Sequence, residues 1–333
     1  MRIAVTGSVA TDHLMAFPGR FVDQLLPDQL AHLSLSFLVD TLEVRRGGVA
    51  ANIAYGLGEL GLSPLLAGAV GADFAEYEVW LKEHGVDTAG VHVSGAHQTA
   101  RFMCMTDQDS NQIASFYAGA MAEAAAIDLC ELALSCGPLD LVLISPNDPG
   151  AMLRHTGQCR ELGIPFAADP SQQLARLDRE EVRALVEGAR WLFTNEYESA
   201  LLRERTGWSA DEVLARVGTW VTTLGAQGVR IERKEGAETT TVTVGAVPDV
   251  PAEDPTGVGD AFRAGFLAAV SKGAALEPAA QLGCAMAALA LTAVGSQSYE
   301  AGPGVLLATV EAAYGAGAAE QLAAVLETRG DRS

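Results

Sequence analysis

Two aspartates frame a glycine-rich turn in the segment DPTGVGDAF, residues 254–262, which runs directly into the apolar segment RAGFLAAV. The glycines at 257 and 259 permit backbone conformations that are closed to other residues, and Pro255 fixes one φ angle. A helix that begins near Val258 would point its first free N–H groups into this turn, and the helix dipole would add partial positive charge. The segment therefore predicts a site for an anion such as a phosphoryl group during its transfer.

The second aspartate, Asp260, falls in the first turn of this expected helix. A carboxylate there can take the proton from a hydroxyl group that attacks the phosphoryl group. We therefore interpret Gly257, Val258 and Gly259 as an anion hole and Asp260 as a general base. An N-capping aspartate with turn glycines on an ordinary helix would give the same pattern, so the segment alone leaves both interpretations open.

Short β-rich apolar runs alternate with amphipathic segments along most of the chain. This alternation predicts an α/β fold in three layers, with a mostly parallel sheet covered by helices on both faces. The expected core strands are 3–5, 65–70, 141–145, 166–169, 191–194 and 220–224. The expected helices begin near residues 47, 73, 148, 180, 195, 211, 258 and 277.

Two regions break this alternation. Residues 35–44 and 100–117 read as strands, and in the second region the turn DSNQ separates RFMCMTD from IASFY, as in a β-hairpin. We predict one domain, residues 1–333, with a small β-sheet lid contributed by residues of about 14–45 and 96–120. Two edge strands of the main sheet are the alternative.

Composition narrows the class of protein. The 333 residues are 49% hydrophobic, and 42 acidic residues against 22 Lys and Arg give a formal net charge of −20, which argues against a nucleic-acid partner. The five cysteines form no C-x-x-C pair and the six histidines show no zinc-binding spacing, so neither a disulfide framework nor a zinc site is expected. No signal peptide or bilayer-length apolar run is seen, and we expect a cytoplasmic protein without a membrane partner.

The segment GLGELG, residues 56–61, matches the dinucleotide-binding pattern G-x-G-x-x-G. In such a site the glycines follow a strand and open a helix, whereas here a helical pattern precedes them and a strand follows. We interpret Gly61 as a helix C-cap.

The segment DPTGVGDAF resembles the signature D-T-x-G-A-G-D-x-F of the ribokinase-like (PfkB) sugar and nucleoside kinases, in which the last aspartate is the catalytic base. Pro255 and Val258 depart from that signature, and neither change removes an amide from the anion hole. Further similar segments follow in the family's order along nearly the whole chain: Asp12 after the first strand, RGGVAAN (46–52), NEYE (195–198) and TLGAQG (223–228).

The resemblance implies a fold with a β-lid, ATP and Mg²⁺ as cofactors, and roles for the matching residues. Asp12, Gly48 and Asn52 would bind sugar hydroxyls, and Asn195 and Glu198 would order Mg²⁺ and phosphate, with Glu198 acting through water. ATP would lie on Thr223, Gly225 and Gly228. The resemblance also implies a homodimer and a monovalent cation such as K⁺ near Asp254 and Gly295. The adjacent glycines at 47 and 48 would allow a hinge for the lid.

Longer runs are similar to the adenosine kinases of actinobacteria: AVTGSVATDHLMAFPGRF, LSLSFLVD, QIASFYAGAM, FAADPSQQLARL and EDPTGVGDAFRAGF. This similarity implies phosphorylation of the 5′-hydroxyl of adenosine, with Phe102 and Phe116 stacking on the purine. The other substrate-binding residues would be Ser8, Ser36, Gln172, Gln173 and Arg176.

Other interpretations stay open. Packing within the lid would also explain the two phenylalanines. The arginines at 46, 101, 176 and 263 could hold a phosphosugar, so a kinase of the same family acting on ribose, inosine or a phosphosugar is an alternative. A non-catalytic nucleoside-binding protein is the more distant one.

Overall fold

Eight strands of the described chain form the main sheet, in the order β14-β13-β12-β11-β10-β9-β1-β4. The computed structural model describes residues 1–25, 34–236 and 238–326. The parallel strands are β1 (Ile3–Thr6), β4 (Leu65–Ala67), β9 (Leu141–Ile144), β10 (Phe166–Ala168), β11 (Trp191–Asn195) and β12 (Thr219–Thr223). Two antiparallel strands extend one edge, β13 (Val229–Glu235) and β14 (Glu238–Val244).

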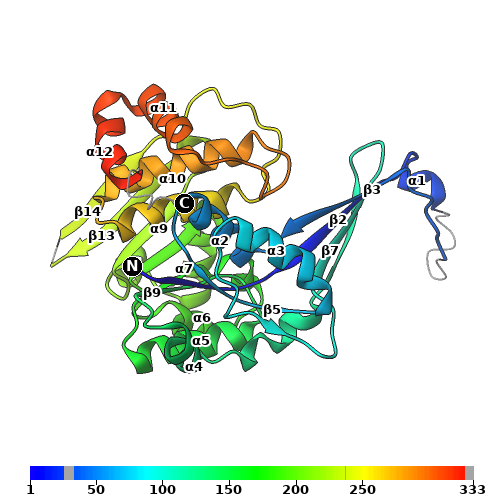
Figure 1. The fold of residues 1–333 in the computed structure, drawn as a ribbon, viewed down its shortest axis with the longest axis horizontal. Coiled ribbons are helices and arrows are strands. Elements are labelled where there is room, and N and C mark those ends of the chain that lie inside the picture. Colours follow the sequence, from blue (N-terminus) through cyan, green and yellow to red (C-terminus); the bar gives the residue numbers. More distant parts are fainter. Residues whose placement is uncertain (26–33, 237, 327–333) are drawn as a thin grey trace.

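Helices cover both faces of this sheet, because its strands are apolar on both sides (Figure 1). Val5 packs into one buried cluster and its neighbour Ala4 into the other, as the alternation of side chains along a strand requires. The first cluster contains side chains of α2 (Val49–Glu59), α3 (Ala75–Glu83), α9 (Val258–Ser271), α10 (Leu276–Leu291), α11 (Pro303–Tyr314) and α12 (Ala316–Leu326). The second contains side chains of α4 (Leu129–Cys136), α5 (Pro149–Leu162), α6 (Arg179–Val186), α7 (Glu196–Thr206) and α8 (Ala210–Leu214).

A separate four-stranded sheet projects from this body (Figure 1). Its order is β3 (Thr41–Gly47), β2 (Ala10–Ala16), β7 (Ala100–Thr106) and β8 (Gln112–Tyr117), and the short helix α1 (Phe21–Gln24) lies at its far end. The register aligns Arg45, Asp12, Phe102 and Phe116 in one row across the four strands. Because aligned residues share a face, these four side chains lie on the same side of the lid.

The remaining elements are short. A two-stranded sheet pairs β5 (Ala69–Val70) with β6 (His92–Val93). Short 3₁₀ segments are η2 (Ala72–Phe74), η3 (Gly119–Ala126), η4 (Ser171–Ala175) and η5 (Gly225–Gln227).

The α/β fold with a separate small sheet is confirmed, including the hairpin β7–β8, so the alternative of two edge strands on the main sheet is wrong. The predicted start of α9 at Val258 is also confirmed. Helix α2 precedes Gly61 and strand β4 follows it, and Gly61 has a φ of 78°, as expected for a helix C-cap. No helix within the described ranges is long and apolar enough to cross a membrane.

Several predicted boundaries are wrong. Residues 34–40 form no strand, and the lid strand there begins at Thr41; residues 26–33 of the predicted lid lie outside the described residues. The expected strand 65–70 is divided at Gly68 between β4 and β5. The backbone of Gly7 comes so close to Gly68 that a Cβ there would lie 2.9 Å from the carbonyl oxygen of Gly7. Strand β2 begins at Ala10, and β2, β13, β14 and helix α4 were not predicted.

Candidate active site

The turn before α9 leaves its amides free. Gly257 is the N-cap residue, with φ at 78°, and no side chain caps the helix. The backbone N–H groups of Gly257, Gly259 and Asp260 have no acceptor among the described residues. A Cβ on Gly257 would lie 2.5 Å from Cβ of Ser296, so the turn requires glycine there. The predicted anion hole is therefore present as a set of free donors at a helix N-terminus.

This turn separates two cavities. The first, of about 430 Å³, is lined by Thr256, Gly257 and Asp260 of the turn, and the second, of about 620 Å³, by Pro255, Val258 and Gly259. Neighbouring residues of one short loop thus face opposite compartments. A group held at the free amides would lie between a molecule in the first cavity and a molecule in the second, as transfer between the two requires.

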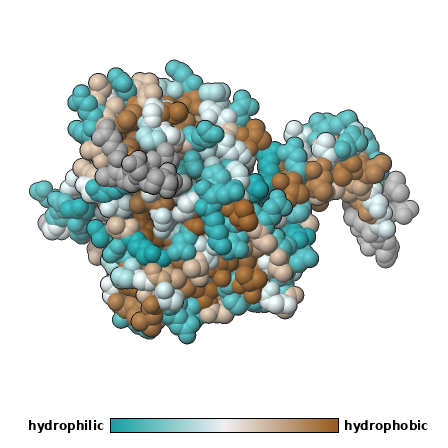
Figure 2. Space-filling model, in the orientation of Figure 1, coloured by the Kyte–Doolittle hydropathy of each residue, from teal (hydrophilic) through white to brown (hydrophobic). Residues whose placement is uncertain are grey.

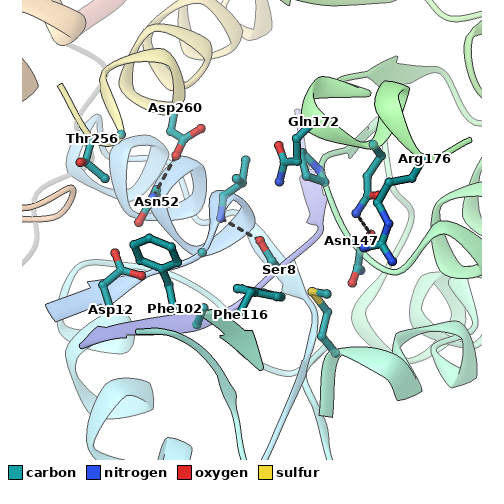
Figure 3. Close-up of a pocket in the computed structure, with 17 residues that line it drawn as sticks. Ser8, Asp12, Asn52, Phe102, Phe116, Asn147, Gln172, Arg176, Thr256 and Asp260 are labelled. Atoms are coloured by element: carbon teal, nitrogen blue, oxygen red, sulfur yellow. Dashed lines mark hydrogen bonds between the residues drawn. The ribbon is translucent and has the colours of Figure 1, made fainter. Parts of the chain in front are cut away.

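Asp260 faces the first cavity as a partly buried carboxylate (Figure 3). Its Oδ2 accepts a 2.9 Å hydrogen bond from Nδ2 of Asn52. Burial raises the pKa of Asp260 to about 6, against the opposing effects of the Arg263 charge and the hydrogen bond from Asn52. A carboxylate with that pKa is ionised at neutral pH and basic enough to accept a proton from an alcohol as it attacks.

The side chain of Asn52 is fixed by a buried hydrogen-bond network. Its Oδ1 accepts hydrogen bonds of 2.9 Å from Oγ of Ser296 and 2.9 Å from Nε2 of Gln297. Gln297 in turn contacts Tyr77, whose hydroxyl donates to the carbonyl of Gly47. Because Oδ1 of Asn52 accepts these two hydrogen bonds, the amide nitrogen Nδ2 is the atom that faces Asp260.

A buried ion pair lies behind the turn. Nη2 of Arg263 is 2.7 Å from Oδ1 of Asp169, and the two side chains are 9% and 1% exposed. A Cβ on Gly259 would lie 2.8 Å from Nη1 of Arg263, so the guanidinium packs against the anion hole. Although burial lowers it, the carboxylates of Asp169 and Asp260 hold the pKa of Arg263 above its ordinary value. Arg263 therefore adds a permanent positive charge beside the free amides.

The other walls of the first cavity come from the carboxyl ends of the parallel strands and from the lid (Figure 3). Ser8 follows β1, Asn147 follows β9, and Gln172, Gln173 and Arg176 follow β10, while the lid contributes Asp12, Phe102 and Phe116. The Ser8 hydroxyl accepts a 3.0 Å hydrogen bond from the amide of Val49 at the start of α2. The sequence-predicted substrate residues Ser8, Asp12, Gly48, Asn52, Phe102, Phe116, Gln172, Gln173 and Arg176 all line this cavity.

Two buried polar groups on this wall lack partners among the described residues. Nε2 of Gln173 donates a 2.7 Å hydrogen bond to the carbonyl of Asn147, which leaves Oε1 of Gln173 as an unused acceptor. Nδ2 of Asn147 is an unused donor. Buried polar groups are nearly always paired, so this pair is suited to the polar edge of a ligand.

Asp12 lies where the lid meets the body. Burial raises its pKa, Arg45 lowers it and Asp254 raises it further. A Cβ on Gly48, which has a φ of 94°, would lie 2.6 Å from the carbonyl oxygen of Ser8 and from the amide of Ala10. Glycine at 48 thus lets the β3–α2 corner pack against the backbone that leads to Asp12.

The second cavity contains the predicted nucleotide residues Thr223, Gly225 and Gly228 at the end of β12. Asn195 and Glu198 do not line it. They form a capping box at the start of α7, in which Glu198 Oε2 accepts from the amide of Asn195 at 2.7 Å and Asn195 Oδ1 accepts from the amide of Glu198 at 2.8 Å. Their predicted roles toward Mg²⁺ and phosphate stay predictions.

In the described part of the chain, no three His, Cys, Asp or Glu side chains are placed so that they could hold a metal ion. Glu198 is buried and its Oε1 accepts a 3.1 Å hydrogen bond from Ser171. An acceptor-only carboxylate of this kind suits the hydrogens of water bound to Mg²⁺, because this ion keeps much of its hydration. The ion itself would then be held by the phosphates of the nucleotide.

Two further predicted residues lie outside the cavities. Ser36 is exposed in the irregular segment before β3. Asp254 begins the anion-hole turn, and its Oδ1 accepts from the amide of Thr256 at 2.9 Å while Oδ2 accepts from the amide of Gly295 at 3.0 Å. The predicted roles of Ser36 in binding substrate and of Asp254 in binding a cation stay predictions.

Some lining residues were missed from the sequence. Met121, Pro146 and Asn147 line the first cavity, and Val247, Pro248, Val250, Cys284, Ala287, Ala288 and Leu291 line the second. Asn147 could have been found, because it follows a predicted parallel strand at the edge where α/β proteins bind ligands. The apolar residues of α10 carry no signal that separates a cavity wall from core.

Comparisons with known proteins agree with this arrangement. A model of the pfkB family of carbohydrate kinases matches residues 6–301. The nucleoside kinase of Methanocaldococcus jannaschii is 32% identical over 254 residues, which cover 76% of this chain and 81% of that protein. The nucleoside kinase of Burkholderia thailandensis, solved in complex with inosine, is 34% identical with a TM-score of 0.81, covering 94% of this chain and 97% of that one. Its structure in complex with ADP-inosine gives 35% identity and a TM-score of 0.79, with coverage of 94% and 96%.

Proposed function

The chain belongs to the pfkB family of carbohydrate kinases, and from this premise we propose that it transfers the γ-phosphoryl group of ATP to the 5′-hydroxyl of adenosine. One observation carries the proposal. Within a single turn, Asp260 faces one cavity and Gly259 faces the other, with free helix amides between them. Only a reaction between two bound molecules makes use of that arrangement.

In the proposed reaction, adenosine occupies the first cavity with its 5′-hydroxyl at Asp260. The carboxylate accepts the hydroxyl proton while the oxygen attacks the γ-phosphorus, and the amides of Gly257, Gly259 and Asp260 bind the oxygens of the phosphoryl group. Arg263 supports them with its buried charge. Mg²⁺ on the nucleotide would neutralise charge on the phosphates, and ADP would remain on the β12 side.

The walls of the first cavity favour a nucleoside. Phe102 and Phe116 lie directly opposite each other on β7 and β8, on the lid face that lines the cavity, and Phe116 is 52% exposed. Exposed rings facing a cavity are suited to stacking on a base. Asp12, Gly48 and Asn52 line the same cavity as these rings, and they would bind the ribose that connects base and reacting hydroxyl.

Gln173 and Asn147 give the wall of the first cavity an unused acceptor and an unused donor, which suit the polar edge of a purine. The amide nitrogen of Gln173 donates to the carbonyl of Asn147, so its Oε1 is the acceptor that stays unused. The exocyclic amino group of adenine or the N1–H of hypoxanthine can donate to it, and Nδ2 of Asn147 can donate to N1 of adenine or to the 6-oxo group of hypoxanthine. Gln172 offers a second amide on the same wall.

Closure of the lid completes the proposed site. In Figure 1 the lid extends away from the body, and on it the side chain of Phe116 is 52% exposed while that of Phe102 is half-buried. Bending at Gly47 and Gly48 would bring Phe102 and Phe116 over the bound nucleoside and exclude water, which otherwise competes as an acceptor.

A homodimer is part of the same proposal. The lid face opposite the Arg45–Phe116 row carries Leu42, Val44, Ile113 and Tyr117, which are 59%, 58%, 50% and 40% exposed. Figure 2 shows apolar side chains gathered along the projecting lid. An exposed apolar sheet face of this kind is typical of an association surface, and a second copy of the lid would cover it symmetrically.

An acceptor screen tests the proposed function. ADP release is measured with adenosine, inosine, ribose and a phosphosugar at equal ATP, and we expect the highest kcat/KM with adenosine. A higher kcat/KM for a sugar or phosphosugar would assign another activity of the family. Calorimetric binding of adenosine without transfer to any acceptor would indicate a nucleoside-binding protein instead.

A further inference from the structure

We propose that the guanidinium of Arg45 takes the place that a monovalent cation would hold beside Asp254, so that phosphoryl transfer by this chain does not depend on K⁺. The inference rests on the proposed function for its activity measurement. Its structural part concerns only how the anion-hole turn is held, and it can be measured without turnover.

The geometry around Asp254 carries the inference. Nη1 of Arg45 is 3.2 Å from Oδ2 of Asp254, and the two side chains are 26% and 14% exposed. The same oxygen accepts the amide of Gly295 at 3.0 Å, while Oδ1 accepts the amide of Thr256 at 2.9 Å. Both oxygens of the carboxylate are therefore engaged by donors, and its charge is already paired. A cation bound to Asp254 would be repelled by the positive charge of Arg45 at short distance.

Other carboxylates hold the guanidinium in this position. Glu43 accepts from Arg45 at 3.1 Å through Nε and at 2.6 Å through Nη2. Asp12 on β2 is paired with Arg45 on β3 in the lid, and the positive charge of Arg45 lowers the pKa of Asp12. Arg45 thus stands among three acids, Asp12, Glu43 and Asp254. Without Arg45, no described residue would form an ion pair with these acids, and a cation would become favourable there.

The contact between Arg45 and Asp254 also connects the lid to the proposed catalytic turn. Arg45 is on strand β3 of the lid, whereas Asp254 begins the turn that presents the free amides of Gly257 and Gly259. Their contact therefore joins the lid to the anion-hole turn. Arg45 lines neither cavity, so it is a positioning residue that acts through Asp254 and not a catalytic one.

The experiment compares K⁺ with tetramethylammonium at equal ionic strength. Wild-type kcat and melting temperature should be the same in both salts. Arg45→Ala should lose kcat by about tenfold to 10²-fold in tetramethylammonium, as expected for a displaced catalytic turn, with a smaller change in KM for ATP. K⁺ should restore most of that kcat and raise the melting temperature of the variant. Arg45→Lys should retain kcat without K⁺.

The control is Arg20→Ala, which removes an exposed lid ion pair with Asp109 and should respond to neither salt. Wild-type activation or stabilisation by K⁺ over tetramethylammonium would overturn the inference, and this arm needs no variant. A loss in Arg45→Ala that K⁺ does not restore would overturn it as well. If no acceptor gives turnover, the proposed function fails, while the melting temperatures still decide whether Arg45 replaces the cation.

Discussion

Asn52 donates a 2.9 Å hydrogen bond from Nδ2 to Oδ2 of Asp260, and Ser296 and Gln297 hold Asn52 in the orientation that makes this possible. The bond favours the ionised form of Asp260, which is the form that accepts a proton. Three residues from two separate parts of the chain thus act, against the effect of burial, on the protonation state of one carboxylate.

The pH dependence of turnover follows from this contact. Burial raises the pKa of Asp260 to about 6, so kcat/KM should fall as pH decreases through about 6 and the base becomes protonated. Replacing Asn52 by Leu removes a donor to the charged form, so the pKa of Asp260 should rise and the acid limb should move to higher pH. Rate profiles of both proteins check this prediction. An acid limb that stays in place or moves to lower pH in Asn52→Leu would contradict it.

The free amides at the start of α9 can be tested through Gly257. Gly257→Ala places a Cβ 2.5 Å from Ser296 at a φ of 78°, so the turn must shift. We expect kcat to fall by about 10²- to 10³-fold, as when donors to a transition state are displaced.

Gly273→Ala is the matched control, because Gly273 has a φ of 84° just after the other end of α9, with open space where a Cβ would lie. It should lose about 1 kcal/mol of unfolding free energy with kcat unchanged. Equal kcat losses in both variants would show that the effect is global.

The lid rings should matter for the nucleoside and not for the nucleotide. Phe102→Ala should raise KM for adenosine by the equivalent of about 1 to 3 kcal/mol, the range found for base–aromatic stacking, with little change in KM for ATP. Phe102→Tyr keeps a ring and should restore affinity for adenosine. Steady-state kinetics with each substrate varied in turn measure both constants. Equal increases for the two substrates would show that the rings only pack the lid.

The apolar outer face of the lid predicts the oligomeric state. Light scattering should give a molar mass of twice 34.7 kDa for the wild type. Val44→Glu should give the mass of a monomer, because a dimer would bury the new charge in its interface. Val79→Glu is the control, since Val79 is similarly exposed, at 56%, on α3 of the body. A monomeric wild type at micromolar concentration would contradict the proposed association.

The parts of this site that could be predicted are those whose chemistry is local. The turn glycines, the start of α9 and Asp260 stand in one nine-residue segment, and alternating apolar runs predict the sheet that carries it. Residues 35–40 were wrongly predicted as strand because an apolar alternation needs a partner strand, and the described chain offers none there: Leu38 is 86% exposed. Strands β13 and β14 were missed because their polar, Thr-rich edge carries little hydrophobic signal.

Contacts between distant segments could not be predicted in the same way. Arg45 and Asp254 are 209 residues apart, and Asn52 and Gln297 are 245 residues apart. Neither pair shows a sequence pattern, because its geometry depends on how the lid and helices α2 and α9 pack. Likewise, the division of the turn between two cavities is a property of the packed body.

The central claim is that Asp260 activates a nucleoside hydroxyl for attack on ATP. The most direct measurement follows ATP labelled in its γ-phosphoryl group in the presence of adenosine, with wild type and Asp260→Asn compared. The wild type should move the label to the 5′-oxygen of AMP, and the variant should lose about 10²- to 10⁴-fold in kcat while it still binds ATP and adenosine. Label transfer by Asp260→Asn at a rate near that of the wild type would contradict the account.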